Sequence, residues 1–144
     1  MSPVPSQPSK LPYSTDIQYY VDYLRNNYGG KKITTPEGYE VRFYLEKDSD
    51  CLHVVCGKGK TAVNHARARM IPYIEYVLLD ESTRVLRFNK KSRNICFVSR
   101  KHSYVIICSV IRNKELKFIS QFYDQSKNKT YIDSFDNRSM YREI

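Results

Sequence analysis

Apolar and polar residues along this chain follow a helical period first and a strand period later. The first helical pattern has apolar residues at the i, i+3, i+4 and i+7 positions: Ile17, Tyr20, Val21, Leu24 and Tyr28. Ser14 and Thr15 are good N-cap residues, and the pair Gly29-Gly30 supplies a stop. The pattern therefore predicts one amphipathic helix between these signals.

The next segment favours strands. Thr35–Gly38 has the composition of a turn, and the alternation that follows predicts a strand over Tyr39–Leu45. After a polar turn at Lys47–Asp50, Cys51–Cys56 is interpreted as a second strand. The short connection predicts that the two strands form a hairpin.

A helical period returns after Gly57 and predicts a second helix that begins near Thr61. Its apolar face consists of Ala62, Val63, Ala66 and Met70. His65 and Arg69 then fall along one edge of that face, and Arg67 falls along the other. Pro72 can open a further short helix that ends near Leu79.

The second half of the chain has the pattern of successive strands. These are Arg84–Phe88, Asn94–Ser99, Ser103–Ile111 and Leu116–Tyr123, with an edge strand at Thr130–Ile132. The third is apolar on both faces and is expected at the centre of a sheet. The predicted fold class is α+β, with N-terminal helices packed on one face of a twisted, mostly antiparallel sheet of four to five strands.

The composition predicts a single domain over residues 14–133. Residues 1–13 contain four prolines and are expected to form a flexible leader, and residues 134–144 are expected to form a polar tail. An apolar content of 41% excludes a disordered chain.

The charge is strongly segregated within a net value of +9. Thirteen of the 24 Lys and Arg residues lie between Cys51 and Lys114, against three carboxylates, and all three histidines lie there too. This distribution indicates a polyanion, an anionic surface or an acidic partner protein. No apolar run approaches the roughly 20 residues of a membrane span, and the N-terminal residues lack the apolar core of a signal peptide. We therefore expect no membrane partner, and a protein that works in a cytoplasm, its own or that of a target cell.

The cysteines and carboxylates argue against a metal site. The four cysteines lack the paired spacing of zinc ligands and are expected to be buried, reduced thiols, with zinc a minor alternative. The basic region also lacks the clustered carboxylates that hold metal ions in many nucleases. A nuclease of this composition would be metal-free and without a cofactor. It would act on RNA, whose own 2′-hydroxyl can attack the neighbouring phosphate.

Several residues are candidates for that chemistry. Gly57–Thr61 lacks the first glycine of a phosphate loop, but Lys58 and Lys60 could bind a backbone phosphate; a tight turn is the alternative. His53 and His65 can move protons near neutral pH, whereas His102 is expected to be a surface residue. Four arginines could line a phosphate-binding groove or only confer solubility: Arg84, Arg87, Arg93 and Arg100. Ser120 is expected to share a face with Phe118 and Phe122, as a core serine or as a site residue.

Residues 51–124 resemble the Barnase–EndoU–colicin–RelE superfamily of small RNases, in its phage and mobile-element branch. The resemblance rests on Cys51–Val55, on the basic helix Asn64–Ile74, on the strand with Arg84, on the meander through Arg100 and Tyr104–Val110, and on the closing strand Phe118–Tyr123. It implies a toxin-like endoribonuclease that cleaves tRNA or mRNA without a metal ion and leaves a 2′,3′-cyclic phosphate. That family's closing strand commonly carries Thr where Ser120 stands.

By position, the resemblance implies acid–base roles for His53 or His65, and orienting roles for Ser120 and Tyr123. The catalytic candidates are His53, His65, Arg84 and Ser120; the nucleic-acid-binding candidates are Lys58, Lys60, Arg67, Arg69, Arg87, Arg93, Arg100 and Tyr123. Two alternatives stay open. One is a non-catalytic RNA- or DNA-binding module, and the other is a basic protein that binds an acidic antitoxin or immunity protein.

Overall fold

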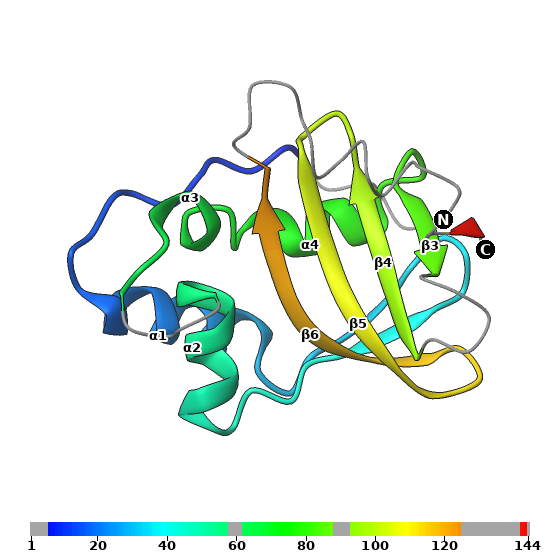
Figure 1. Cartoon of the computed structure of the whole chain (residues 1–144), viewed down its shortest axis with the longest axis horizontal. Helices are drawn as coiled ribbons and strands as arrows, with labels where there is room; N and C mark the ends of the chain where they lie inside the picture. The colour runs from blue at the N-terminus through cyan, green and yellow to red at the C-terminus, as the bar shows by residue number, and fades with distance from the viewer. Residues whose placement is uncertain (1–5, 58–61, 88–92, 125–141, 144) are drawn as a thin grey trace.

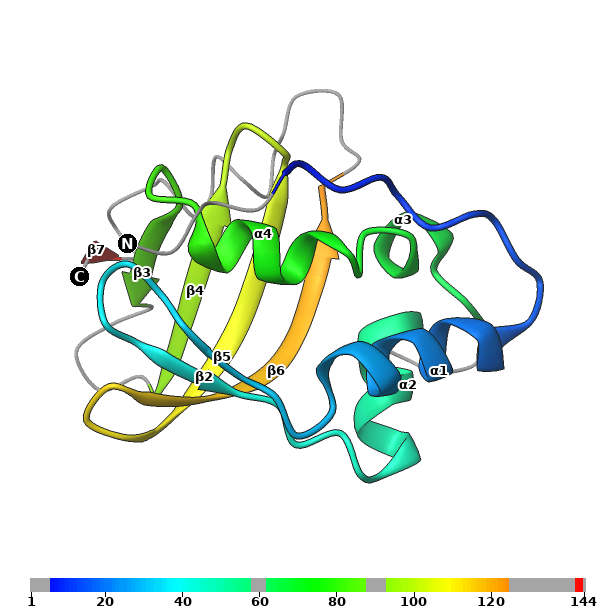
Figure 2. The same ribbon diagram turned by 180° about the vertical axis from the view of Figure 1, so that it is seen from behind.

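The computed structural model describes residues 6–57, 62–87, 93–124 and 142–143 of the 144-residue chain. Its helices are α1 (Ile17–Tyr28), α2 (Asp48–Cys56), α3 (His65–Ala68) and α4 (Tyr73–Leu79). Its strands are β1 (Lys32–Thr34), β2 (Glu40–Arg42), β3 (Arg84–Arg87), β4 (Asn94–Ser99), β5 (Tyr104–Arg112), β6 (Glu115–Tyr123) and β7 (Arg142–Glu143). The predicted α+β class is confirmed, because helices pack against a mostly antiparallel sheet (Figures 1 and 2).

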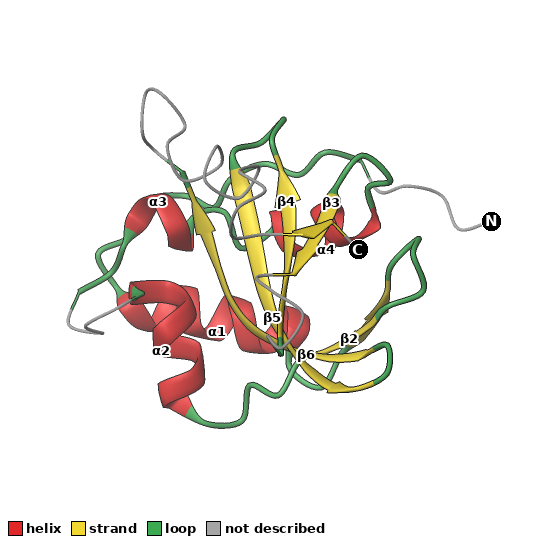
Figure 3. Ribbon diagram, turned by 45° about the vertical axis from the view of Figure 1, so that its right-hand side comes forward, coloured by secondary structure: helices red, strands yellow, loops and turns green. Residues whose placement is uncertain are grey.

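The sheet is wider than predicted. Within the described residues it has seven strands in the order β1-β2-β6-β5-β4-β3-β7, instead of four to five. β2 pairs in parallel with only the first three residues of β6, Glu115–Lys117, and every other pairing is antiparallel. Past Lys117 the edge of β6 lies beside α2 and α3 (Figure 3). This junction positions most of the residues discussed below.

Helix α1 forms where the apolar spacing predicts it. Tyr20, Val21, Leu24 and Tyr28 are buried. The N-cap is Asp16, whose carboxylate accepts a hydrogen bond from the backbone N–H of Gln18, one residue later than the predicted caps. Gly29 caps the other end through its N–H bond to the carbonyl of Arg25.

The predicted strand over Cys51–Cys56 is wrong, because this segment belongs to helix α2. Asp48 and Asp50 lie in its first turn, where carboxylates stabilise the helix dipole. The buried residues Cys51, Val54 and Val55 have i, i+3, i+4 spacing, which places them on one face of a helix. The predicted hairpin therefore does not form, and β2 pairs with β1 and β6 instead.

The second predicted helix is shorter than expected. Helix α3 begins at His65, where the side chain of Asn64 caps the N–H of Arg67, and the predicted start at Thr61 lies outside the described residues. Helix α4 follows Pro72 and ends at Leu79, as the sequence predicts.

The four-strand meander is confirmed over β3 to β6, with β5 near its centre. The side chains of Val105, Ile106 and Cys108 are fully buried on this strand. The two short strands β1 and β7 had no clear sequence signal, and the predicted strand Thr130–Ile132 lies outside the described residues.

The two faces of the sheet bury different sets of side chains. The inner face packs on the helices and includes Phe97, Ile106 and Phe118. The outer face carries a smaller apolar cluster of Leu86, Cys96, Val98 and Val105, against which Ile107 and Phe122 pack. A β-bulge in β6 changes its alternation between the faces, since Cys108 pairs with Phe118 but Ile107 pairs with Ser120.

Candidate functional site

His65 and Arg69 contact the N-terminal segment of the chain. The ring of His65 stacks on Tyr13 at 4.1 Å between centroids, and its Nδ1 lies 3.4 Å from the hydroxyl of Tyr20. The Nε of Arg69 donates to the carbonyl of Leu11 at 2.7 Å, and Leu11 is itself buried. Both side chains therefore hold residues 11–13 against α1 and α3, so the N-terminal segment covers the helix edge on which the sequence places them.

Arg67 is partly buried between α3 and α2. Its Nη1 donates to the carbonyl of His53 at 3.2 Å, while its Nε is buried and has no hydrogen-bond partner among the described residues. Burial lowers the pKa of this guanidinium. Gly57 makes the approach possible, because a Cβ at this glycine would lie 2.8 Å from Nη1. The side chain of Arg67 thus links α3 to the end of α2.

Two cation–ring contacts lie at the end of β6, one between Arg67 and Phe122 and one between Lys10 and Tyr123. Together with Arg69, which bonds to the residue next to Lys10, we term these residues the α3–β6 surface. The Cζ of Arg67 lies 6.0 Å from the ring centroid of Phe122, and the Nζ of Lys10 lies 4.7 Å from that of Tyr123. Both rings are partly exposed, and they point to opposite faces of the sheet, because Phe122 pairs with Val105 and Tyr123 pairs with Tyr104. Within the described parts of the chain, no carboxylate lies within ion-pair distance of Lys10, Arg67 or Arg69. The surface therefore combines cations that lack a counter-charge there with accessible aromatic rings.

Gln121 fastens this surface to the sheet. Its Nε2 donates to the carbonyls of Val54 at 3.2 Å and of Arg67 at 3.0 Å, so one side chain joins α2 and α3 to β6. The bulge places Gln121 on the inner face, opposite Ile106. This positioning residue had no signal in the sequence, because its role depends on the bulge.

His53 lies on α2 and lines a pocket of about 120 Å³ where β2 leaves β6. We term this the His53 pocket, and its lining residues are Tyr44, Leu45, Ser49, Asp50, His53, Lys117, Phe118 and Ile119. Tyr44 is 41% exposed. The pocket brings together an imidazole, an ammonium, a carboxylate and a phenol, which is the set of groups that acid–base chemistry on a phosphate diester needs.

Ser120 shares a face with Phe122, as predicted, but not with Phe118. The bulge at Ile119 moves it to the outer face with Ile107 and Phe122, instead of the inner face with Phe118. Its hydroxyl is buried and, in the part of the chain that the structure describes, has no hydrogen-bond partner. Ser120 is absent from the residues that line the His53 pocket.

The four arginines of the meander do not line one groove. Arg84 lies opposite Val98 on the outer face, whereas Arg87 lies opposite Ile95 on the inner face, where its charge acts on Tyr39. Arg93 precedes β4 and donates to the carbonyls of Val110 and Ile111, while Arg100 is exposed in the turn at the other end of β4. The outcome follows from geometry, since residues three apart on a strand point to opposite faces.

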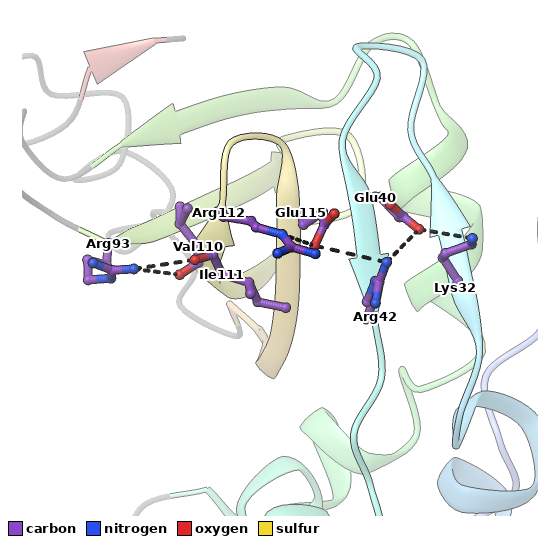
Figure 4. A network of polar contacts seen from close by, with 8 residues as sticks. All are labelled: Lys32, Glu40, Arg42, Arg93, Val110, Ile111, Arg112 and Glu115. Atoms are coloured by element: carbon purple, nitrogen blue, oxygen red, sulfur yellow. Dashed lines mark hydrogen bonds and ion pairs between the residues drawn. The ribbon is translucent and has the colours of Figure 1, made fainter.

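Cations near the β5–β6 turn are engaged by carboxylates. Figure 4 shows a chain of contacts in which Glu40 pairs with Lys32 and Arg42, and Glu115 pairs with Arg42 and Arg112. The distances between charged atoms run from 3.0 Å for Lys32–Glu40 to 4.0 Å for Arg42–Glu115. These cations carry less unbalanced charge than those of the α3–β6 surface.

Sequence reasoning missed Tyr44, Lys117 and Lys10. Lys117 lies outside the basic segment, and it meets Tyr44 only because β2 pairs in parallel with β6 and then diverges. The polar alternation of Glu40, Arg42 and Tyr44 was a usable signal for one exposed strand face. Lys58 and Lys60 lie outside the described residues.

The described residues form neither a metal site nor a membrane-spanning helix. No group of three or more His, Cys, Asp or Glu side chains there is arranged to hold a metal ion. The four cysteines are buried and free, as predicted. None of the helices in these parts of the chain is both long and apolar enough to cross a membrane.

This chain has no detectable match among known proteins. No protein-family model, curated protein sequence or solved structure matches this chain.

Proposed function

We propose that this protein is a metal-independent endoribonuclease and that the His53 pocket is its active site. The observation that carries the proposal is the shared lining of that pocket by His53, Lys117, Asp50 and Tyr44. The pocket has room for a phosphate group but not for a whole nucleotide, which suits a site that holds only the scissile group.

The chemistry follows from the groups present. A 2′-hydroxyl attacks the adjacent phosphorus, so that a 2′-O–P bond forms and the P–O5′ bond breaks. The products are a 2′,3′-cyclic phosphate and a 5′-hydroxyl. Asp50 or neutral His53 can take the proton of the 2′-hydroxyl, and protonated His53 can give one to the leaving O5′. Lys117 would stabilise the charge that develops on the phosphoryl oxygens.

The direct test is incubation of the purified protein with RNA in EDTA. We expect cleavage to survive chelation, to leave 2′,3′-cyclic phosphate ends, and to fall at least 100-fold in His53→Ala, consistent with the usual contribution of an acid–base group. His65→Ala is the matched control, because His65 packs on Tyr13 and Tyr20. Equal loss in both variants, or no loss in His53→Ala, would contradict the assignment.

A second candidate is a non-catalytic RNA-binding module. It is favoured by the scatter of the other catalytic candidates, since His65, Arg84 and Ser120 lie outside the lining of the His53 pocket. Intact RNA that is retarded on a gel, with an affinity that falls steeply with salt, would support this candidate. Binding to an acidic protein instead of RNA would support the antitoxin or immunity-protein alternative. The cytoplasmic location and the resemblance to the Barnase–EndoU–colicin–RelE superfamily stay predictions.

A further inference from the structure

We propose that a second cavity beside the His53 pocket binds a nucleotide that adjoins the scissile phosphate, with its base stacked on Tyr44 and its phosphate held by Lys32 and Arg42. This inference rests on the proposed function in one respect only, namely that the ligand is RNA. It adds a nucleotide-binding subsite, its position on the sheet and the residues that form it.

The second cavity, which we term the β1–β2 cavity, has a volume of about 310 Å³. It is lined by Gly30, Lys31, Lys32, Arg42, Phe43 and Tyr44. This volume is more than twice that of the His53 pocket and reaches the lower end of the range for small-molecule sites, which begins at about 300 Å³. Tyr44 lines both hollows, so a site for a phosphate group directly adjoins a larger one. The lining of the larger one includes three cations and no carboxylate.

The ring of Tyr44 is accessible at the junction of the two hollows. Tyr44 is 41% exposed, whereas the preceding residue, Phe43, is buried and stacks on Phe118 on the inner face of the sheet. Because side chains alternate along an extended chain, Tyr44 points to the same side as Arg42. Its phenol contacts Arg42 and raises the pKa of that guanidinium. Bases stack on such accessible rings with little dependence on sequence, so Tyr44 suits the base of a nucleotide.

The strand register places three cations side by side on the outer face. Lys32 pairs with Arg42 across β1 and β2, and Arg42 pairs with Lys117 across β2 and β6. The adjacent pair Val41 and Leu116 is buried on the inner face, so the three cations point outward. Like charges opposite each other destabilise a sheet, and a phosphate backbone would relieve that repulsion. Since Lys117 lines the His53 pocket and Lys32 lines the β1–β2 cavity, the row connects the two.

Carboxylates engage part of this row from outside the cavity. Glu40 lies 3.0 Å from Lys32 and 3.3 Å from Arg42, and Glu115 lies 4.0 Å from Arg42 (Figure 4). Ion pairs between side chains that reach solvent contribute little to stability, so these cations can turn to a phosphate at low cost. Lys117 has no carboxylate within ion-pair distance among the residues that the structure describes.

The test measures the binding of RNA that cannot be cleaved, so its result does not depend on catalysis. The probe is a labelled four-nucleotide RNA whose 2′-hydroxyls are methylated, and its comparison is the same sugar–phosphate chain without bases. Fluorescence anisotropy would measure both with the unmodified protein and with the variants Tyr44→Ala, Tyr44→Phe and Lys32→Ala. Thermal denaturation of each variant would establish that it is folded.

Two matched controls come from outside the β1–β2 cavity. Tyr13→Ala removes another exposed tyrosine, which stacks on His65. Arg112→Ala removes a cation that pairs with Glu115, as Arg42 does, but does not line the cavity.

We expect the unmodified protein to bind the tetranucleotide roughly 5- to 100-fold more tightly than the chain without bases. Tyr44→Ala should abolish this difference, while Tyr44→Phe and Tyr13→Ala should retain it. Lys32→Ala should reduce the slope of log K against log salt by about 0.7, while Arg112→Ala should not change it.

A preference for bases that survives in Tyr44→Ala would overturn the subsite, and so would equal salt slopes for Lys32→Ala and Arg112→Ala. In either case the proposed function would stand, provided that RNA is cleaved in EDTA. Failure of the tetranucleotide to bind would also overturn the subsite, and the cleavage assay would then decide the proposed function separately.

Discussion

Replacement of Gly57 by Ala tests the link between α2 and α3. Gly57 has φ 74° and ψ −152°, a conformation that side chains with a Cβ disfavour strongly. The added Cβ would also lie 2.8 Å from Nη1 and 3.0 Å from Cζ of Arg67. Because Arg67 is half-buried and its Nη1 is bonded to the carbonyl of His53, the guanidinium cannot move away without losing that hydrogen bond.

The expected cost has two parts. Backbone strain at such a position costs about 1–3 kcal/mol, and a hydrogen bond to a charged group contributes about 1.5–3 kcal/mol. The sum is about 2.5–6 kcal/mol. For a chain of this length, each kcal/mol lowers the melting temperature by about 3 °C, so the melting temperature should fall by roughly 8–18 °C.

Gly30 provides a matched control. It has the same φ of 74°, but a Cβ there would meet no atom within 4 Å. Gly30→Ala should therefore show strain alone, about 1–2 kcal/mol. Urea denaturation of both variants, and of Gly57→Ala combined with Arg67→Ala, would isolate the steric part. If Gly57→Ala is no more destabilising than Gly30→Ala, or if its excess cost persists without the Arg67 side chain, the reasoning is refuted.

Two further predictions concern titratable side chains. His102, expected from the sequence at the surface, packs on two tyrosine rings, and burial followed by the charge of Lys101 lowers its pKa below 6.5. The unfolded chain therefore binds the proton of His102 more readily than the folded chain, so the free energy of unfolding should fall as the pH drops below about 6.5. In urea denaturation at several pH values, His102→Gln should reduce this pH dependence. An unchanged pH dependence in the variant would contradict the role of His102. Burial raises the pKa of Cys96 to about 12 and that of Cys108 well above its usual value, so neither thiol should react with a disulfide reagent at pH 8 until the protein unfolds; labelling faster than unfolding would contradict this.

The elements that the sequence predicts correctly are those in which local pattern and tertiary packing agree. Helix α1 has a clear apolar stripe and caps at both ends, and the meander from β3 to β6 alternates runs of strand-forming residues with polar turns. The burial of β5 follows from its continuous apolar composition. In these segments, residues that are close in sequence determine most of the secondary structure and burial.

The sequence predictions are wrong where contacts between residues far apart in the sequence determine the local structure. The segment Cys51–Cys56 has β-branched residues that suit a strand, but beside the open edge of β6 its buried residues pack as one helical face. Strict alternation predicts that Ser120 shares a face with both Phe118 and Phe122, but a single extra residue at Ile119 places it with Phe122 and away from Phe118. His65 and Arg69 have the predicted spacing, yet both contact the N-terminal segment, which no local pattern predicts.

The sequence by itself determined the fold class, the first helix, the order of the meander and the concentration of positive charge between Cys51 and Lys114. Only the tertiary structure determined which polar and charged side chains lie close to one another. The pairing of β2 with β6 placed Lys117 beside His53, and the bulge in β6 placed Gln121 where it fastens α2 and α3. The physical reason is that charge and periodicity are local properties of a chain, whereas a site is formed by register and by the way strands end, which depend on residues far apart in the sequence.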